Sequence, residues 1–87
     1  MSQNIRITLK LYASLGAYLP AGAERNMASV VAQPDATVQS LLDSHNIPRE
    51  ACHLVLLNGI FQPRERRASA VLTDGDAVAV WPPVAGG

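Results

Sequence analysis

The chain has 87 residues, which is the size of one small domain. Such a domain buries somewhat more than half of its unfolded surface but does not enclose a deep active site, so a self-sufficient enzyme is disfavoured. Seven basic and seven acidic side chains cancel. The chain therefore lacks the positive charge that binding to nucleic acid or an anionic membrane usually requires, and we expect neither partner.

Cysteine and histidine are scarce. Cys52 is the single cysteine, which excludes an internal disulfide and a cysteine zinc cluster and suits a reducing compartment. We interpret Cys52 as a buried residue rather than a sulfur relay. His45 and His53 have no partner at metal-ligand spacing, so we expect structural roles for both and no metal site. The first ten residues hold no long apolar stretch, and we expect a cytoplasmic protein without signal peptide or membrane span.

The first half of the chain begins with a strand. Apolar and polar residues alternate over residues 5–12, which is typical of a half-buried strand. Residues 13–24 contain two glycines and a proline and are interpreted as a loop. Residues 25–33 predict a second, weaker strand, so the two strands are expected to form a hairpin.

A helix is predicted next, because four residues recur at the spacing of one helical face: Val38, Leu41, Leu42 and His45. Either Thr37 or Asp35 is placed to cap its first turn. The helix is expected to end near Asn46, since Pro48 disfavours helical geometry in the residue before it and lacks an amide hydrogen.

The second half of the chain predicts a hairpin and a final strand. The apolar residues 54–57 lead into Asn58-Gly59, which favours a tight hairpin turn. Residues 60–62 are then expected to form the second strand of a short hairpin. Residues 63–68 are polar, with Arg64, Glu65, Arg66 and Arg67, and are interpreted as an exposed, solvated loop. The alternative is that this loop helps to meet an acidic surface of a partner.

The last strand is predicted over residues 77–81, after a turn at residues 73–76 whose aspartates are explained by turn formation. Pro82-Pro83 ends this strand because proline donates no ladder hydrogen bond. We therefore predict one α+β domain over residues 1–87, with four to five strands packed on one main helix and residues 82–87 as an extended tail.

The tail consists of Pro82, Pro83, Val84, Ala85, Gly86 and Gly87. The prolines favour an extended direction, and six residues span at most about 20 Å. Two glycines without Cβ atoms can enter a narrow tunnel in a partner. A carboxylate at Gly87 is ionised at neutral pH and is a poor electrophile, so a partner must activate it, for example as an acyl-adenylate made with ATP.

The run from Leu72 to Gly87 resembles the C-terminal signature of the MoaD/ThiS family of ubiquitin-like sulfur carriers. It combines a turn, a hydrophobic strand, a proline pair and a glycine pair at the end of the chain: Asp74-Gly75-Asp76, residues 77–81, Pro82-Pro83 and Gly86-Gly87. Residues 9–13 resemble the first strand of that family and residues 38–42 its helix. The strand that ends in an aromatic residue before two prolines is more similar to the small subunit of molybdopterin synthase than to the thiamine-pathway carrier.

The resemblance implies a β-grasp fold and a chain that carries sulfur as a substrate or subunit, without catalytic side chains or a bound cofactor. Gly87 would be adenylated by an E1-like enzyme that uses ATP, and then thiocarboxylated with sulfur from a donor such as a cysteine desulfurase or rhodanese. Gly86 would line the tunnel of the acceptor, which is the large subunit of molybdopterin synthase or another enzyme. The segment between Gly59 and Leu72 departs from the molybdopterin branch, since it is longer and more basic.

Two aromatic residues are candidates for docking the partner. Tyr12 has the parity of the polar residues of its strand, and Trp81 lies opposite the core-facing Val78 and Val80. If their strands are neighbours, as the resemblance implies, the two rings form an exposed aromatic patch near the tail, which is typical of protein interfaces. The alternative is that Trp81 caps the core.

Four functions remain open. The first is sulfur delivery to molybdopterin, for the molybdenum or tungsten cofactor. The second uses the same activation but delivers sulfur to thiamine thiazole or another metabolite. In the third the chain is a ubiquitin-like modifier joined through Gly87 to lysines, and in the fourth it is an interaction domain with an inert tail.

Overall fold

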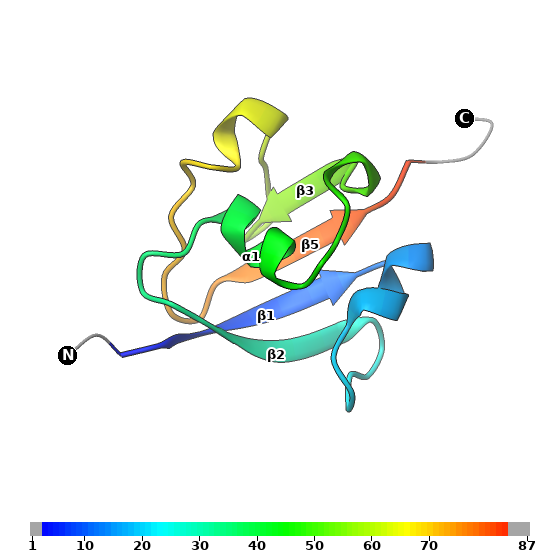
Figure 1. The fold of residues 1–87 in the computed structure, drawn as a ribbon, viewed down its shortest axis with the longest axis horizontal. Helices are drawn as coiled ribbons and strands as arrows, with labels where there is room; N and C mark the ends of the chain where they lie inside the picture. Colours follow the sequence, from blue (N-terminus) through cyan, green and yellow to red (C-terminus); the bar gives the residue numbers. More distant parts are fainter. Residues whose placement is uncertain (1–2, 84–87) are drawn as a thin grey trace.

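In the computed structural model, which describes residues 3–83, five strands form one mixed sheet in the order β2-β1-β5-β3-β4 (Figure 1). The strands are β1 (Ile5–Leu11), β2 (Met27–Ala32), β3 (Leu54–Leu57), β4 (Ile60–Phe61) and β5 (Ala77–Trp81). The central pair, β1 and β5, is parallel, and the other neighbours are antiparallel. Helix α1 (Val38–Ser44) lies across one face of the sheet. This arrangement confirms the predicted α+β, β-grasp architecture.

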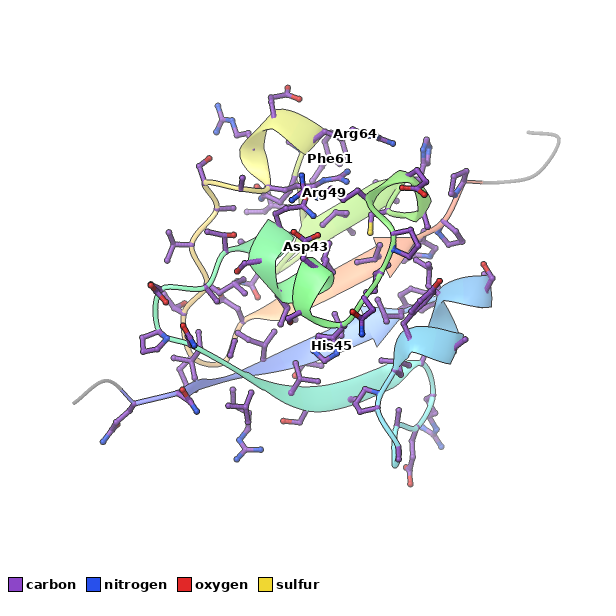
Figure 2. All side chains as sticks on the ribbon, viewed as in Figure 1. Asp43, His45, Arg49, Phe61 and Arg64 are labelled. Carbon is purple, nitrogen blue, oxygen red and sulfur yellow. The ribbon has the colours of Figure 1, made fainter. Side chains whose placement is uncertain are left out.

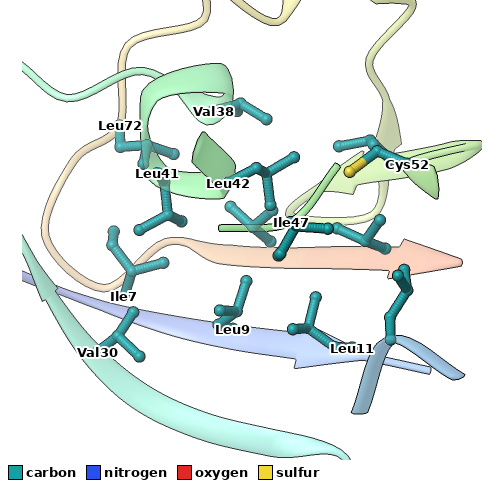
Figure 3. Packing of buried hydrophobic residues seen from close by; sticks show 14 residues of the cluster. Ile7, Leu9, Leu11, Val30, Val38, Leu41, Leu42, Ile47, Cys52 and Leu72 are labelled. Carbon is teal, nitrogen blue, oxygen red and sulfur yellow. The ribbon is translucent and has the colours of Figure 1, made fainter. Parts of the chain in front are cut away.

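The core lies between α1 and the sheet (Figure 3). The alternation along β1 places Ile7, Leu9 and Leu11 on the helix side, where all three are fully buried. From α1, Val38 and Leu42 meet them and are equally buried. Burying each such side chain contributes roughly 1.5–3 kcal/mol, so this one layer of aliphatic contacts supplies most of the driving force for folding. The opposite face of the sheet has no helix over it among residues 3–83.

Helix α1 begins where one of the two predicted caps places it. The Thr37 hydroxyl accepts a hydrogen bond from the Ser40 amide at 3.1 Å, and the Ser40 hydroxyl accepts one from the Thr37 amide at 2.8 Å. This reciprocal pair satisfies two amides that the first turn leaves without helical partners. The helix ends at Ser44, and Asn46 then takes a φ of 62°, a left-handed conformation that stops helices.

The two predicted turns form as the sequence indicates. Asn58 and Gly59 have φ angles of 51° and 83°, which is the pair of positive values that a tight hairpin between β3 and β4 needs. Before β5, burial alone would raise the pKa of Asp76. Hydrogen bonds from Asn58 and from the amide and hydroxyl of Thr73 outweigh that effect and hold the pKa below its usual range.

The prediction of a loop over residues 13–24 is wrong for its first half, where Ala13–Tyr18 forms a 3-10 helix. Two causes act together. Ala13 takes a φ of 53°, which turns the chain sharply at the end of β1. Leu15 is then buried against the core, at 2% exposure, and its amide donates to the carbonyl of Tyr12. The apolar residues of this segment are interrupted by two glycines and a proline and show no periodic pattern that would predict this helix.

The prediction of an exposed loop over residues 63–68 is also wrong in part. Arg64–Arg66 forms a short 3-10 helix whose side chains are exposed, but Arg67 is only 3% exposed. Its guanidinium donates to three backbone carbonyls, which compensate for the loss of water around the charge. No helix among residues 3–83 is long and apolar enough to cross a membrane.

Candidate functional site

The tail leaves the sheet at the end of β5, which is the central strand beside β1. The Trp81 carbonyl accepts a hydrogen bond at 3.0 Å from the amide of His53, the residue before β3. Among the described residues, this is the last hydrogen bond that β5 makes on its β3 side. Pro82 is half-buried and Pro83 is exposed, and neither has an amide hydrogen to continue the ladder. The remaining tail residues lie outside the described residues: Val84, Ala85, Gly86 and Gly87.

Tyr12 and Trp81 are stacked beside this exit. Their ring centroids are 4.4 Å apart and the ring planes differ by 8°. Trp81 alternates with the buried Val78 and Val80, so its ring lies on the face that α1 does not cover. The expected neighbourhood of the two rings is therefore present. Each ring covers part of the other, and both residues are half-buried.

Backbone hydrogen bonds fix Tyr12 in this position. Its amide donates to the Val80 carbonyl at 3.1 Å, which continues the β1–β5 pairing by one residue. Its carbonyl accepts from the Leu15 amide at 3.1 Å, so the 3-10 helix holds it from the other side. The Asn26 side chain also donates to the neighbouring Leu11 carbonyl at 3.0 Å. These hydrogen bonds fix the backbone that carries the Tyr12 ring of the aromatic stack.

The aromatic pair continues into an apolar surface across β3 and β4. Leu54 lies directly opposite Trp81, and Leu56 lies opposite both Ala79 and Phe61. Leu54 and Phe61 are 36% and 54% exposed. We call this surface the outer-face patch, and it consists of Tyr12, Leu54, Leu56, Phe61 and Trp81.

Three members of the outer-face patch were missed by sequence reasoning. A usable signal existed, because Val55 faces the core and its neighbours Leu54 and Leu56 must then face outward. It was hidden because all four residues of β3 are apolar, so the strand shows no alternation. Phe61 joins the patch only through its register opposite Leu56.

The charges on this face are positive. Arg6 and Lys10 occupy outward positions of β1, and Lys10 lies opposite Ala79 on β5. Among the described strand residues on this face, none is acidic. At the β4 side of the sheet, Arg64 follows Phe61 in the adjoining 3-10 helix, and Figure 2 labels both. A complementary partner would therefore be apolar at its centre and acidic at its rim.

The helix side of the molecule has different features. Asp43 and Arg49 form an ion pair with a 2.8 Å contact, and the Arg49 hydrogen bond holds the pKa of that carboxyl below its usual range (Figure 2). An open groove of about 450 Å³ runs between β2 and α1, lined by Val31, Ser40 and others. It lies beside the start of β1, at the opposite end of the sheet from the tail exit.

Cys52 and the histidines fit the structural interpretation. Cys52 is 1% exposed, and burial raises the pKa of its thiol, so the unreactive neutral form is favoured. His45 is half-buried behind α1, and burial lowers the pKa of its imidazole. The His53 side chain is exposed, and its contribution to the fold comes from its backbone. Residues 3–83 contain no cluster of histidine, cysteine or acidic side chains that could hold a metal ion.

Solved structures with the same fold have been determined for several proteins. The HVO 2177 protein of Haloferax volcanii is 28% identical, with a TM-score of 0.70 over 97% of this chain and 88% of that chain. SAMP1 from the same organism is 26% identical, with a TM-score of 0.63 over 94% and 99% of the two chains. The protein–protein complex of subunits 1 and 2 of the molybdopterin-converting factor from Helicobacter pylori contains a chain that is 17% identical, with a TM-score of 0.59 over 95% and 100%. That last likeness concerns the fold alone.

The comparison with curated proteins gives no match. The sequence pattern of the ThiS family matches residues 21–87, which is most of the chain and includes the whole tail. This match agrees with the resemblance that the sequence predicted and with the observed β-grasp fold. The matched residues include Trp81, where the tail leaves the sheet. The chain therefore belongs to the ThiS family.

Proposed function

We propose that this chain is a sulfur carrier for molybdopterin biosynthesis, the pathway to the molybdenum or tungsten cofactor, and that it acts in the cytoplasm. Gly87 carries the sulfur as a thiocarboxylate. An E1-like enzyme activates Gly87, and the large subunit of a molybdopterin synthase-type complex receives the tail and the sulfur. The chain itself supplies neither a catalytic side chain nor a bound cofactor.

The chemistry takes place at one carboxylate. The Gly87 carboxylate attacks the α-phosphate of ATP in the partner's site and releases pyrophosphate, which gives an acyl-adenylate. Hydrosulfide then attacks the acyl carbon, AMP leaves, and a proton is lost as the thiocarboxylate forms. If the donor is a persulfide, the first product is an acyl disulfide, and a thiol must reduce it to the thiocarboxylate while forming a disulfide itself.

The observation that carries this proposal is the family match through Gly87, on a chain whose last strand is followed by two prolines that donate no further ladder hydrogen bond. The outer-face patch adds support, since it adjoins the point where the tail leaves. A partner that binds the outer-face patch would hold the tail at the entrance of the partner's active site. Delivery of the carboxylate then becomes an intramolecular step.

Molybdopterin is favoured as the product by the tail and by one structural relative. Trp81-Pro82-Pro83 resembles the small subunit of molybdopterin synthase, and a chain of the same fold occurs in a complex of the two subunits of a molybdopterin-converting factor. In a host strain that lacks the gene, we expect loss of molybdoenzyme activity and normal growth without thiamine. A thiamine requirement with normal molybdoenzyme activity would instead assign the sulfur to thiazole.

The second candidate is a ubiquitin-like modifier. It is favoured by the likeness to SAMP1 and to small archaeal modifier protein 1, both from Haloferax volcanii and each 26% identical to this chain. In that case the same acyl-adenylate would react with a lysine amine and form an amide bond. Covalent adducts of this chain on larger proteins, lost when Gly87 is deleted, would support the modifier.

The activation step has a direct test. The adenylating enzyme of the host should catalyse exchange of pyrophosphate into ATP in the presence of the wild-type chain, since the acyl-adenylate forms reversibly. Deletion of Gly87 should abolish this exchange and leave the circular dichroism spectrum and melting temperature unchanged. Exchange that persists without Gly87 would contradict the proposed role of that residue.

A further inference from the structure

Arg67 lies far from the tail in sequence but is joined to the tail exit through one peptide group. Its Nη1 donates to the Cys52 carbonyl at 2.7 Å, the shortest of its three hydrogen bonds. The amide of the same peptide group belongs to His53, and it donates to the Trp81 carbonyl at 3.0 Å. A buried positive charge and the last hydrogen-bonded residue before the tail thus sit on opposite sides of one peptide bond.

This arrangement strengthens the contact at the tail exit. A hydrogen bond from a charged donor is stronger than one between neutral groups, and it pulls electron density toward the carbonyl that accepts it. The amide of that peptide then becomes a better donor, because hydrogen bonds in a chain polarise one another. The low exposure of Arg67, 3%, keeps water from screening the effect. No carboxylate within residues 3–83 pairs with Arg67 to offset its charge.

The rest of the Arg67 side chain holds the same region together. Nη2 donates to the His53 carbonyl at 3.2 Å, and Nε donates to the Gln62 carbonyl at 3.0 Å, just beyond β4. Its own carbonyl accepts from the Gln39 amide of α1 at 2.9 Å. One residue therefore ties the start of β3, the end of β4 and the helix to the strand end that carries the tail.

We propose that Arg67 is a positioning residue that fixes the direction in which the tail leaves the fold, by acting through the Cys52–His53 peptide on the Trp81 carbonyl. Pro82 and Pro83 have no amide hydrogen to donate, so the hydrogen bond at the Trp81 carbonyl and the Tyr12 stack hold the start of the tail. A tail with a fixed direction pays less entropy on entering a partner. The expected effect of Arg67 on activation rests on the proposed function. The coupling of Arg67 to the Trp81 carbonyl does not depend on that function.

The structural part is tested by nuclear magnetic resonance on the full chain. Arg67→Met removes all three donors and keeps an apolar stem of similar length. The matched control is Val30→Ala, which destabilises the core from β2, at the far side of the sheet. In Arg67→Met the His53 amide proton resonance should move upfield of its position in Val30→Ala. The His53 amide should also exchange with deuterium about tenfold faster than in Val30→Ala, when each rate is normalised to the exchange of the other hydrogen-bonded amides at β5. The same His53 shift and exchange rate in both variants would overturn the proposal.

The functional part uses pyrophosphate exchange by the host's adenylating enzyme. Arg67→Met should raise KM for the chain several-fold more than Val30→Ala does, with a smaller change in kcat, because the tail enters the site less often but reacts normally once there. If the wild-type chain supports no exchange, the proposed function fails while the His53 result still decides the role of Arg67. If the wild-type chain is activated and both variants have equal KM, the positioning role is wrong.

A conservative variant covers the case in which Arg67→Met does not fold. Arg67→Lys keeps the charge, but one ammonium group cannot reach three diverging carbonyls. It should show the same changes as Arg67→Met in smaller measure, with partial recovery of the His53 shift. If neither variant folds, Arg67 is a stabiliser of the whole fold and the positioning role is overturned.

Discussion

The indole of Trp81 and the phenol ring of Tyr12 are stacked nearly in parallel, with centroids 4.4 Å apart. The contact joins the ends of the two central strands, one residue before Pro82 begins the tail. Because this stack lies on the face that α1 leaves uncovered, it is available to a partner as well as to the fold. The first prediction separates those two roles.

Trp81→Ala should weaken binding to the adenylating enzyme by about 2 kcal/mol, or about 30-fold, as for an aromatic anchor at the centre of an interface. Loss of the stack itself should cost only about 0.5–1.5 kcal/mol of stability, a drop of several degrees in Tm. Titration calorimetry and thermal melting measure the two effects. Ile60→Ala, which removes an exposed apolar side chain outside the outer-face patch, is the control. A large loss of Tm with unchanged affinity would mean that Trp81 caps the core.

The extent of the outer-face patch is tested at Phe61. Its side chain is 54% exposed and lies opposite Leu56, so Phe61→Ala removes patch surface without opening a cavity in the core. We expect a loss of about 1 kcal/mol in partner affinity and less than about 0.5 kcal/mol in stability. Val71→Ala removes a side chain of similar exposure, 57%, away from the sheet and should leave affinity unchanged. Equal affinity of the two variants would restrict the docking surface to the aromatic pair.

Cys52 is predicted to take no part in sulfur transfer. Its thiol is buried and its pKa is raised by that burial, so alkylating reagents should modify it in the native chain far more slowly than in urea. Cys52→Ala should cost about 1 kcal/mol of stability through lost packing and should not change the rate of thiocarboxylate formation. A variant that folds but cannot be thiocarboxylated would show that Cys52 is a relay after all.

Acid stability is predicted to depend in part on Asp76. Hydrogen bonds lower its pKa in the folded chain below the ordinary value of 3.8, so the unfolded chain takes up the proton first as the pH falls. The contribution of Asp76 is therefore present above about pH 4 and is lost as the pH falls through its folded pKa. Urea denaturation at several pH values should show a shallower acid loss for Asp76→Asn. Asp35→Asn, which removes an exposed carboxylate, is the control. Equal slopes in Asp76→Asn and wild type would contradict the prediction.

Local pattern was enough to predict the strands, the main helix and the hairpin turn. The alternation that buries Ile7 and Leu9, the Thr37 cap, and the Asn58-Gly59 turn each act within a few residues, so the sequence alone indicates them. The position of Trp81 beside Tyr12 needed one further fact, the parallel pairing of β1 with β5. That pairing joins the two ends of the chain, and only the family resemblance pointed to it.

The features that sequence reasoning missed depend on contacts between distant segments. Arg67 has the same side chain as its exposed neighbours Arg64 and Arg66. What distinguishes it is a set of three carbonyls from residues that flank β3 and β4. Phe61 joins the outer-face patch only because of the register of a two-residue strand. Charge and hydropathy along the chain carry no information about such pairings, so a charge run was interpreted as solvated throughout.

The proposed sulfur load on Gly87 is tested by the intact mass of the protein isolated from its native host. The protein must be purified without a C-terminal tag, since any added residue would block the carboxylate. We expect a species that ends at Gly87 with one oxygen replaced by sulfur, and loss of that species when the adenylating enzyme is deleted. A chain that ends in an ordinary carboxylate under all growth conditions, or that continues beyond Gly87, would contradict the proposal.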